Sequence, residues 1–167
     1  MQTAILVFAV LQAVGAIVGA LSAVWGEIAY VRARKDGAID QAERAHLDAL
    51  ARGLRIGMSV VLLSSFVLVV LAYMSGELAQ PALTTNYWML MALSLLVMYV
   101  SWALSRRRIT FALGSASAFA AWWFIAYLTI GFIPSMSFGA AVALYVVAVG
   151  VFYALLRYAR FLLVSSS

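Results

Sequence analysis

The chain has 167 residues, of which 66% are hydrophobic and 10% are charged, whereas an ordinary soluble domain has about 45–50% apolar and about 25% charged residues. Because a single core in so short a chain cannot bury two-thirds of its side chains, the composition indicates a membrane protein and excludes a soluble enzyme and a disordered tail. The formal net charge of +5 comes without a separate basic domain, so a nucleic-acid-binding protein is excluded as well.

Five apolar runs in the sequence are long enough to cross the hydrocarbon core of a bilayer, which takes roughly 20 helical residues. They lie near residues 3–31, 56–76, 86–105, 109–133 and 138–161. We therefore expect an all-α fold, a polytopic membrane helix bundle with five transmembrane helices that forms a single domain over residues 1–167.

The first apolar run is predicted to be a retained helix, because it lacks the basic start of a signal peptide and exceeds the usual 7–15 apolar residues. One of its faces carries small and polar residues at spacings of three and four, namely Gln12, Gly15, Gly19, Ser22 and Gly26. Helices in lipid associate through close backbone approach. The glycines are therefore predicted to form a packing seam, either inside the bundle or, alternatively, between copies in a homo-oligomer or along a pore wall.

Glu27 is the most informative residue of this run, because a carboxylate in the apolar slab is unfavourable unless it is paired, hydrated or protonated. Arg32 and the three arginines after the third run are expected at the same end of the bundle. Two interpretations stay open at this point: a structural ion pair with one of these arginines, or a group that binds a cation or proton at the inner mouth of a transport path.

The charged connection 32–55 is predicted to contain a short amphipathic helix that lies along the second span or leads directly into it. Asp40 and Glu43 have the spacing of a capping box, so the helix should begin at Gln41. The same residues resemble the second half of a calcium-binding EF-hand loop, but arginines occupy the positions of its first and third oxygen ligands. The capping interpretation is therefore favoured.

The later spans carry scattered hydroxyl and aromatic groups. Ser94 and Ser101 are one heptad apart and give a weak polar stripe, although such hydroxyls usually bond to their own helix backbone. Together with residues of the first span they form the candidate polar path: Glu27, Gln12, Ser22, Ser94 and Ser101. Trp122 and Trp123 fall near the middle of the fourth span, whereas Trp prefers membrane interfaces. They are predicted to pack in the core or, alternatively, to contact a lipid or another apolar ligand.

All eleven basic residues follow the first, third or fifth span and so fall on one side of the membrane. Because cytoplasmic connections retain Lys and Arg, we expect the N-terminus outside and the C-terminus in the cytoplasm. The basic residues near the span ends are predicted to form a belt for anionic lipid headgroups: Arg32, Arg34, Lys35, Arg106, Arg107, Arg108, Arg157 and Arg160.

The residue types argue against catalysis. No Cys is present, the single His lies in the first charged connection, and no acidic pair or base beside a serine occurs in a span. Lys35 is the only lysine, so no span can attach retinal. We expect no enzyme activity, cofactor or metal.

Several short motifs give the chain a resemblance to a known group. They are Gly26-Glu27, Arg32, Asp36-Gly37-Ala38-Ile39, Arg107-Arg108, Ala112-Leu113-Gly114 and Trp122-Trp123. Together they resemble a group of small uncharacterised five-helix proteins of the bacterial inner membrane, a resemblance that implies a setting but no activity.

Two functions are expected from the residues themselves: a small oligomeric channel or transporter for a proton, cation or small solute, or a non-catalytic accessory, scaffold or assembly subunit that binds a partner membrane protein or lipid.

Overall fold

A computed structural model of the chain describes residues 2–35, 41–76, 83–106, 108–131 and 136–165, with side chains for all of these except 33–35, 41–50, 52, 53, 105 and 163–165. The described residues form five α-helices: α1 (Gln2–Lys35), α2 (Gln41–Met74), α3 (Thr85–Ser105), α4 (Phe111–Ile130) and α5 (Phe138–Ser165). The predicted all-α architecture is confirmed.

Each of these helices is long and apolar enough to cross a membrane. The candidate spans are Gln2–Arg32, Leu54–Met74, Thr85–Leu104, Phe111–Ile130 and Phe138–Leu162. The bounds of these spans agree with the apolar runs to within a few residues, although α1 and α2 themselves continue past their spans into the charged connection. By the length and composition of its helices, the chain is an integral, multi-pass membrane protein.

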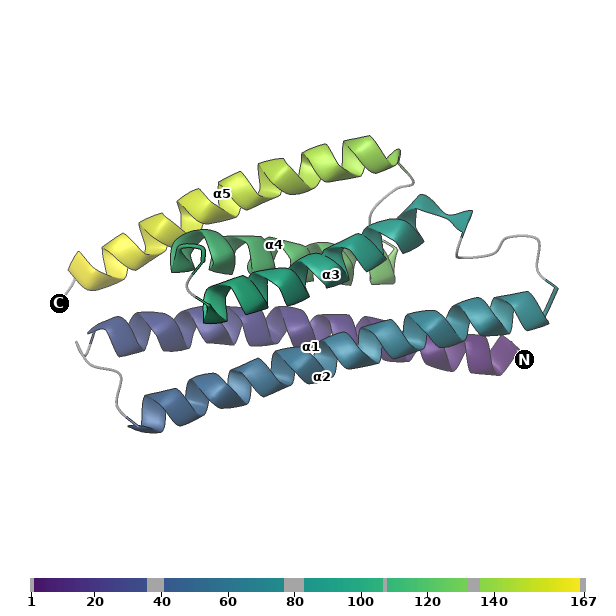
Figure 1. The fold of residues 1–167 in the computed structure, drawn as a ribbon, viewed down its shortest axis with the longest axis horizontal. Helices are drawn as coiled ribbons and strands as arrows, with labels where there is room; N and C mark the ends of the chain where they lie inside the picture. The colour runs from purple at the N-terminus through teal and green to yellow at the C-terminus, as the bar shows by residue number, and fades with distance from the viewer. Residues whose placement is uncertain (1, 36–40, 77–82, 107, 132–135, 166–167) are drawn as a thin grey trace.

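Consecutive helices run in opposite directions, so the start of α1 and the end of α5 lie at opposite ends of the bundle (Figure 1). The C-terminal ends of α1, α3 and α5 share one end, which we call the basic end because Arg32, Arg106, Arg108 and Arg157 are exposed there. The other end holds the start of α1 and the turn after α2.

The predicted short amphipathic helix is not a separate element. It is the first part of α2, which begins at Gln41 as the sequence indicates and continues without a break to Met74. At 34 residues α2 is about 51 Å long, well beyond the roughly 30 Å of a hydrocarbon core. Its first turns should therefore project from the membrane. Asp40, the predicted cap, lies outside the described residues.

Close backbone contact joins α1 to α2, the most extensively packed pair among the described helices. A Cβ atom on Gly57 would lie 3.0 Å from the carbonyl oxygen of Gly15, and a Cβ on Gly15 would lie 2.9 Å from Cγ1 of Val60. Neither glycine can gain a side chain without moving the helices apart. Glycine is therefore what permits the short distance between these two helices.

The core is centred on α4, which packs against α1, α3 and α5. Its buried residues include Ala121, Trp122 and Ile125, each fully buried, and they meet Ala16 and Ala20 of α1 on one side. Only 6% of the residues in an 18-residue apolar stretch of α5 are buried, against 44% in the corresponding stretch of α4. Most of the α5 surface is therefore left to lipid or to another protein.

Candidate functional site

Polar side chains gather at two places inside the bundle. One is a cavity of about 230 Å³ where α1, α2, α3 and α4 meet, lined in part by Gln12 and here called the Gln12 pocket. The other is a set of contacts between Glu27, Ser115 and Arg160, which joins α1, α4 and α5 near the basic end and is here called the Arg160 cluster. Both places combine residues far apart in the sequence.

Gln12 lies ten residues after the start of α1, which places it about 15 Å along the helix and therefore inside the membrane-spanning part. Its Nε2 donates a hydrogen bond of 2.6 Å to Oγ of Ser65 on α2, and that hydroxyl donates to the carbonyl oxygen of Val61 at 2.6 Å. The Oε1 atom of Gln12 bonds to no described residue. Gln12 thus holds α1 to α2 with one end of its amide and keeps an acceptor for another partner.

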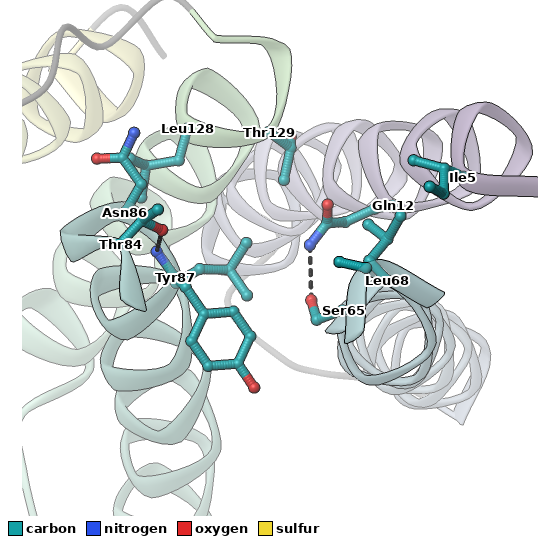
Figure 2. A pocket seen from close by; sticks show the side chains of 11 residues that line it. Ile5, Gln12, Ser65, Leu68, Thr84, Asn86, Tyr87, Leu128 and Thr129 are labelled. Atoms are coloured by element: carbon teal, nitrogen blue, oxygen red, sulfur yellow. Dashed lines mark hydrogen bonds between the residues drawn. The ribbon is translucent and has the colours of Figure 1, made fainter. Parts of the chain in front are cut away.

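The opposite wall of the pocket comes mainly from the start of α3. Figure 2 shows Gln12 and Ser65 on one side of the space and Asn86 and Tyr87 on the other. Thr84 caps α3 by accepting a hydrogen bond from the backbone N–H of Tyr87 at 3.3 Å, which fixes where these side chains leave the helix. The Tyr87 hydroxyl forms no hydrogen bond to any described residue.

The polar residues that line the Gln12 pocket are all uncharged: Gln12, Ser65, Thr84, Asn86, Tyr87 and Thr129. The hydroxyl of Thr129 already donates to the carbonyl oxygen of Ala126 at 2.9 Å, and the remaining walls are aliphatic, including Leu68 and Leu90. The pocket can therefore hold a few water molecules, each about 30 Å³ in volume, or one small polar molecule. Its lining offers hydrogen bonds without a full charge.

In the Arg160 cluster, Nη2 of Arg160 donates to Oε2 of Glu27 at 2.6 Å and to Oγ of Ser115 at 2.6 Å. The two charged side chains are 9% and 13% exposed. The guanidinium group also lies 5.1 Å from the ring centre of Tyr30 and 5.3 Å from that of Phe111, two rings that stack with centres 3.9 Å apart. Ion pairing, a hydroxyl acceptor and cation–π contacts together stabilise this buried charge.

The partner of Glu27 differs from the expected one. Arg32 and the arginines between α3 and α4 were the predicted partners, whereas the structure pairs Glu27 with Arg160. Arg160 in turn leaves the predicted lipid belt, because it is 8% exposed and its guanidinium turns into the bundle. Glu27 and Arg160 lie near the C-terminal ends of α1 and α5, two helices that run in the same direction. This placement could be read from the sequence, and it allows the pairing but does not select it.

The other predicted belt residues divide into two groups. Arg32, Arg106, Arg108 and Arg157 are exposed at the basic end, and Arg108 lies over the ring of Trp102 at 4.9 Å. The side chains of Arg34, Lys35 and Arg107 lie outside the described residues.

The residues of the predicted polar path do not meet in one channel. Gln12 and Glu27 are 15 residues apart on α1, or about 22 Å, and fully buried Ala16 and Ala20 lie between them in the sequence. Ser22 is half-buried and Ser101 is exposed. Ser94 is fully buried, and its Oγ has no hydrogen-bond partner among the described residues.

Trp122 lies against Gly19, which falls between Gln12 and Glu27 along α1. Trp122 is fully buried, in line with the favoured packing in the core rather than the alternative contact with lipid, and its ring lies where a side chain on Gly19 would be. Trp123 is half-buried beside Phe119 and Tyr127, with ring centres 6.3 Å and 6.0 Å away. The indole N–H groups of both tryptophans lack a partner among the described residues.

The glycines of α1 have different surroundings. Gly15 and Gly19 contact α2 and α4 of the same chain, so their close contacts are within the bundle. A side chain on Gly26 would meet no described atom within 4 Å. The alternative of a seam between copies therefore draws no support from Gly15 and Gly19.

Within the described part of the chain, no three His, Asp or Glu residues come close enough together to hold a metal ion. Comparison of the chain with models of protein families, with curated proteins and with solved structures finds no match. The helices and the two polar places therefore carry the functional argument.

Proposed function

We propose that the protein binds a small uncharged polar solute in the Gln12 pocket and carries it across the membrane. The observation that carries this proposal is a partly open pocket between four helices whose lining includes Gln12 and Tyr87, and Gln12 Oε1 has no partner among the described residues. Polar groups in a membrane interior are unfavourable unless they are satisfied. A solute with both donors and acceptors would satisfy them.

The charge of the lining favours an uncharged solute over a proton or a cation. The described carboxylate of the first span, Glu27, already forms a buried ion pair with Arg160, so it is not a free ion-binding group. No described residue in the lining of the Gln12 pocket carries a charge. A cation that entered it would lose hydration without gaining an opposite charge.

The buried contact between Trp122 and Gly19 favours a carrier over an open pore. It lies between the two polar places, so a solute in the Gln12 pocket cannot continue toward the basic end without a rearrangement of α1 against α4. Slow, saturable flux is therefore expected.

The experiment is uptake by proteoliposomes of purified protein, with glycerol and urea as the probes and stopped-flow light scattering as the readout. We expect flux above that of protein-free vesicles, reduced by Gln12→Leu and by Tyr87→Phe. Ser101→Ala is the matched control, because Ser101 is exposed and lines no part of the pocket. Flux that is absent for both probes, or that Gln12→Leu leaves unchanged, contradicts the proposal.

A non-catalytic accessory or scaffold role is the second candidate, and the exposure of α5 favours it. Several large side chains on α5 are more than half exposed, among them Val146, Tyr158 and Phe161. A partner membrane protein could cover this face. This role is supported if native purification recovers a stoichiometric partner protein and the vesicles show no flux. It is contradicted if the protein purifies without a partner and the vesicles show flux.

We also propose that the basic end faces the cytoplasm of a bacterial inner membrane and that the start of α1 faces outward. The exposed arginines at the basic end support this orientation, because Lys and Arg are retained on the cytoplasmic side during insertion. The Gln12 pocket would then lie toward the outer side.

A further inference from the structure

A second cavity lies between α1 and α5, where the two helices barely touch and both pack against α4. Its volume is about 360 Å³, and we call it the α1–α5 groove. Its apolar lining comes from Ile28 and Val31 of α1 and from Leu156 and Ala159 of α5. An apolar recess on the outer surface of a membrane protein is suited to a lipid chain rather than to water.

The charged lining of the groove carries a net positive charge. It consists of Glu27, Arg32 and Arg160. Glu27 and Arg160 neutralise each other at 2.6 Å, and Arg32 is left exposed. Arg160 is 8% exposed, and its Nε has no hydrogen-bond partner among the described residues. Among the described residues, the groove therefore combines a cation without an ion-pair partner, Arg32, with a buried donor on Arg160 that has capacity for a further acceptor.

The position of the groove matches the level of lipid headgroups. The candidate span of α1 ends at Arg32 and that of α5 ends at Leu162, so the charged lining lies at the end of both apolar segments. Arg157, exposed on α5 one turn before Arg160, adds positive charge at the same end. A molecule with a chain in the groove would present its headgroup to these arginines.

We propose that the α1–α5 groove binds one anionic phospholipid, with an acyl chain against Ile28 and Leu156 and the phosphate at Arg32. The charge complementarity selects a lipid with a net negative headgroup over a zwitterionic one. This site is separate from the Gln12 pocket, so the proposal does not depend on solute transport.

The test is native mass spectrometry of the purified, delipidated protein in detergent, with equimolar phosphatidylglycerol and phosphatidylcholine of identical chains. We expect one retained phosphatidylglycerol adduct. Arg32→Gln should lower the preference for it about fivefold, the effect of one interfacial cation. Arg106→Gln is the matched control, because it removes the same charge from an exposed position at the basic end.

A second variant tests the groove rather than the charge. Ala159→Phe should fill the apolar lining and remove the adduct while leaving every arginine in place, and the milder Ala159→Leu serves if the larger residue prevents folding. Equal binding of the two lipids overturns the proposal. So does an equal effect of Arg32→Gln and Arg106→Gln, or an adduct that persists in a folded Ala159 variant.

Discussion

Replacing Gly19 by alanine tests the packing of α1 on α4 most sharply. Gly19 lies against the ring of Trp122, and a Cβ atom at this position would overlap three carbons of that ring. Trp122 is fully buried, so its ring cannot move outward without displacing neighbouring side chains. The overlap must be relieved by separating the two helices or by changing the side-chain conformation of Trp122.

The expected magnitude follows from two opposing effects. Alanine is a better helix former than glycine by about 1 kcal/mol, whereas forcing an extra group into a packed core costs about 1–3 kcal/mol, occasionally more. Because the overlap is with a rigid ring, we expect the upper part of that range. Gly19→Ala should therefore lower the free energy of unfolding by about 2 kcal/mol.

Gly26→Ala is the matched control on the same helix, because a side chain there meets no described atom within 4 Å. It should be neutral or stabilising by up to about 1 kcal/mol. The assay is reversible unfolding in mixtures of sodium dodecyl sulfate and a mild detergent, followed by far-ultraviolet circular dichroism. In the double variant Gly19→Ala/Trp122→Leu, leucine leaves room for the alanine methyl group. The double variant should therefore lose at least about 1 kcal/mol less free energy of unfolding than the sum of the two single variants.

Equal stabilities of Gly19→Ala and Gly26→Ala would refute the reasoning. Additive effects in the double variant would refute it as well, because independent sites do not share a contact. Retention of helical signal in all variants before denaturation is the control for folding.

The same unfolding assay checks three further contacts. Glu27→Gln should lower the free energy of unfolding by about 3 kcal/mol, because it leaves the buried Arg160 without its counter-charge. The double variant Glu27→Leu/Arg160→Leu should recover much of this loss. A double variant that is no more stable than Glu27→Gln would contradict the ion pair. Gly57→Ala should lower the free energy of unfolding by about 1 kcal/mol, the middle of the overpacking range less the gain in helix propensity, because its Cβ would lie 3.0 Å from the carbonyl oxygen of Gly15. An unchanged stability would argue against the close approach of α1 and α2. Ser94→Ala should leave the free energy of unfolding unchanged or raise it slightly, because it removes a buried hydroxyl with no described partner. A decrease of more than about 1 kcal/mol would indicate a hydrogen bond at Oγ.

The helices could be predicted from the sequence because a membrane span depends only on the order of apolar and charged residues along the chain. A run of about 20 apolar residues bounded by charge is sufficient, and the capping pattern before Gln41 placed the start of α2 correctly. The continuity of α2 was only one of two predicted arrangements, since the charged residues before Leu54 do not by themselves break a helix.

The rotation and partners of the helices could not be predicted from the sequence in the same way. Gly19 and Gly26 have the same residue type on the same predicted face, yet only Gly19 has a neighbour in the described structure, since Trp122 lies against it. Arg160 lies near the end of a long apolar helix and so resembles an interfacial arginine. Its burial depends on Glu27 and Ser115, which lie on two other helices.

The Gln12 pocket illustrates the same difficulty. Gln12 could be singled out because an amide in an apolar run is unusual, but Asn86 and Tyr87 sit at the start of a span, where polar residues are ordinary. Only the packing of four helices brings them around one cavity.

The central claim is that the chain crosses the membrane with its basic end in the cytoplasm, and the natural lack of Cys permits a direct measurement. Single cysteines at Gln2, Ser75 and Arg106, all exposed, are labelled in intact cells with a membrane-impermeant maleimide. We predict labelling of Gln2→Cys and Ser75→Cys from outside and of Arg106→Cys only after permeabilisation. Labelling of Gln2→Cys and Arg106→Cys from the same side would contradict the crossing pattern, and the reverse result would contradict the orientation.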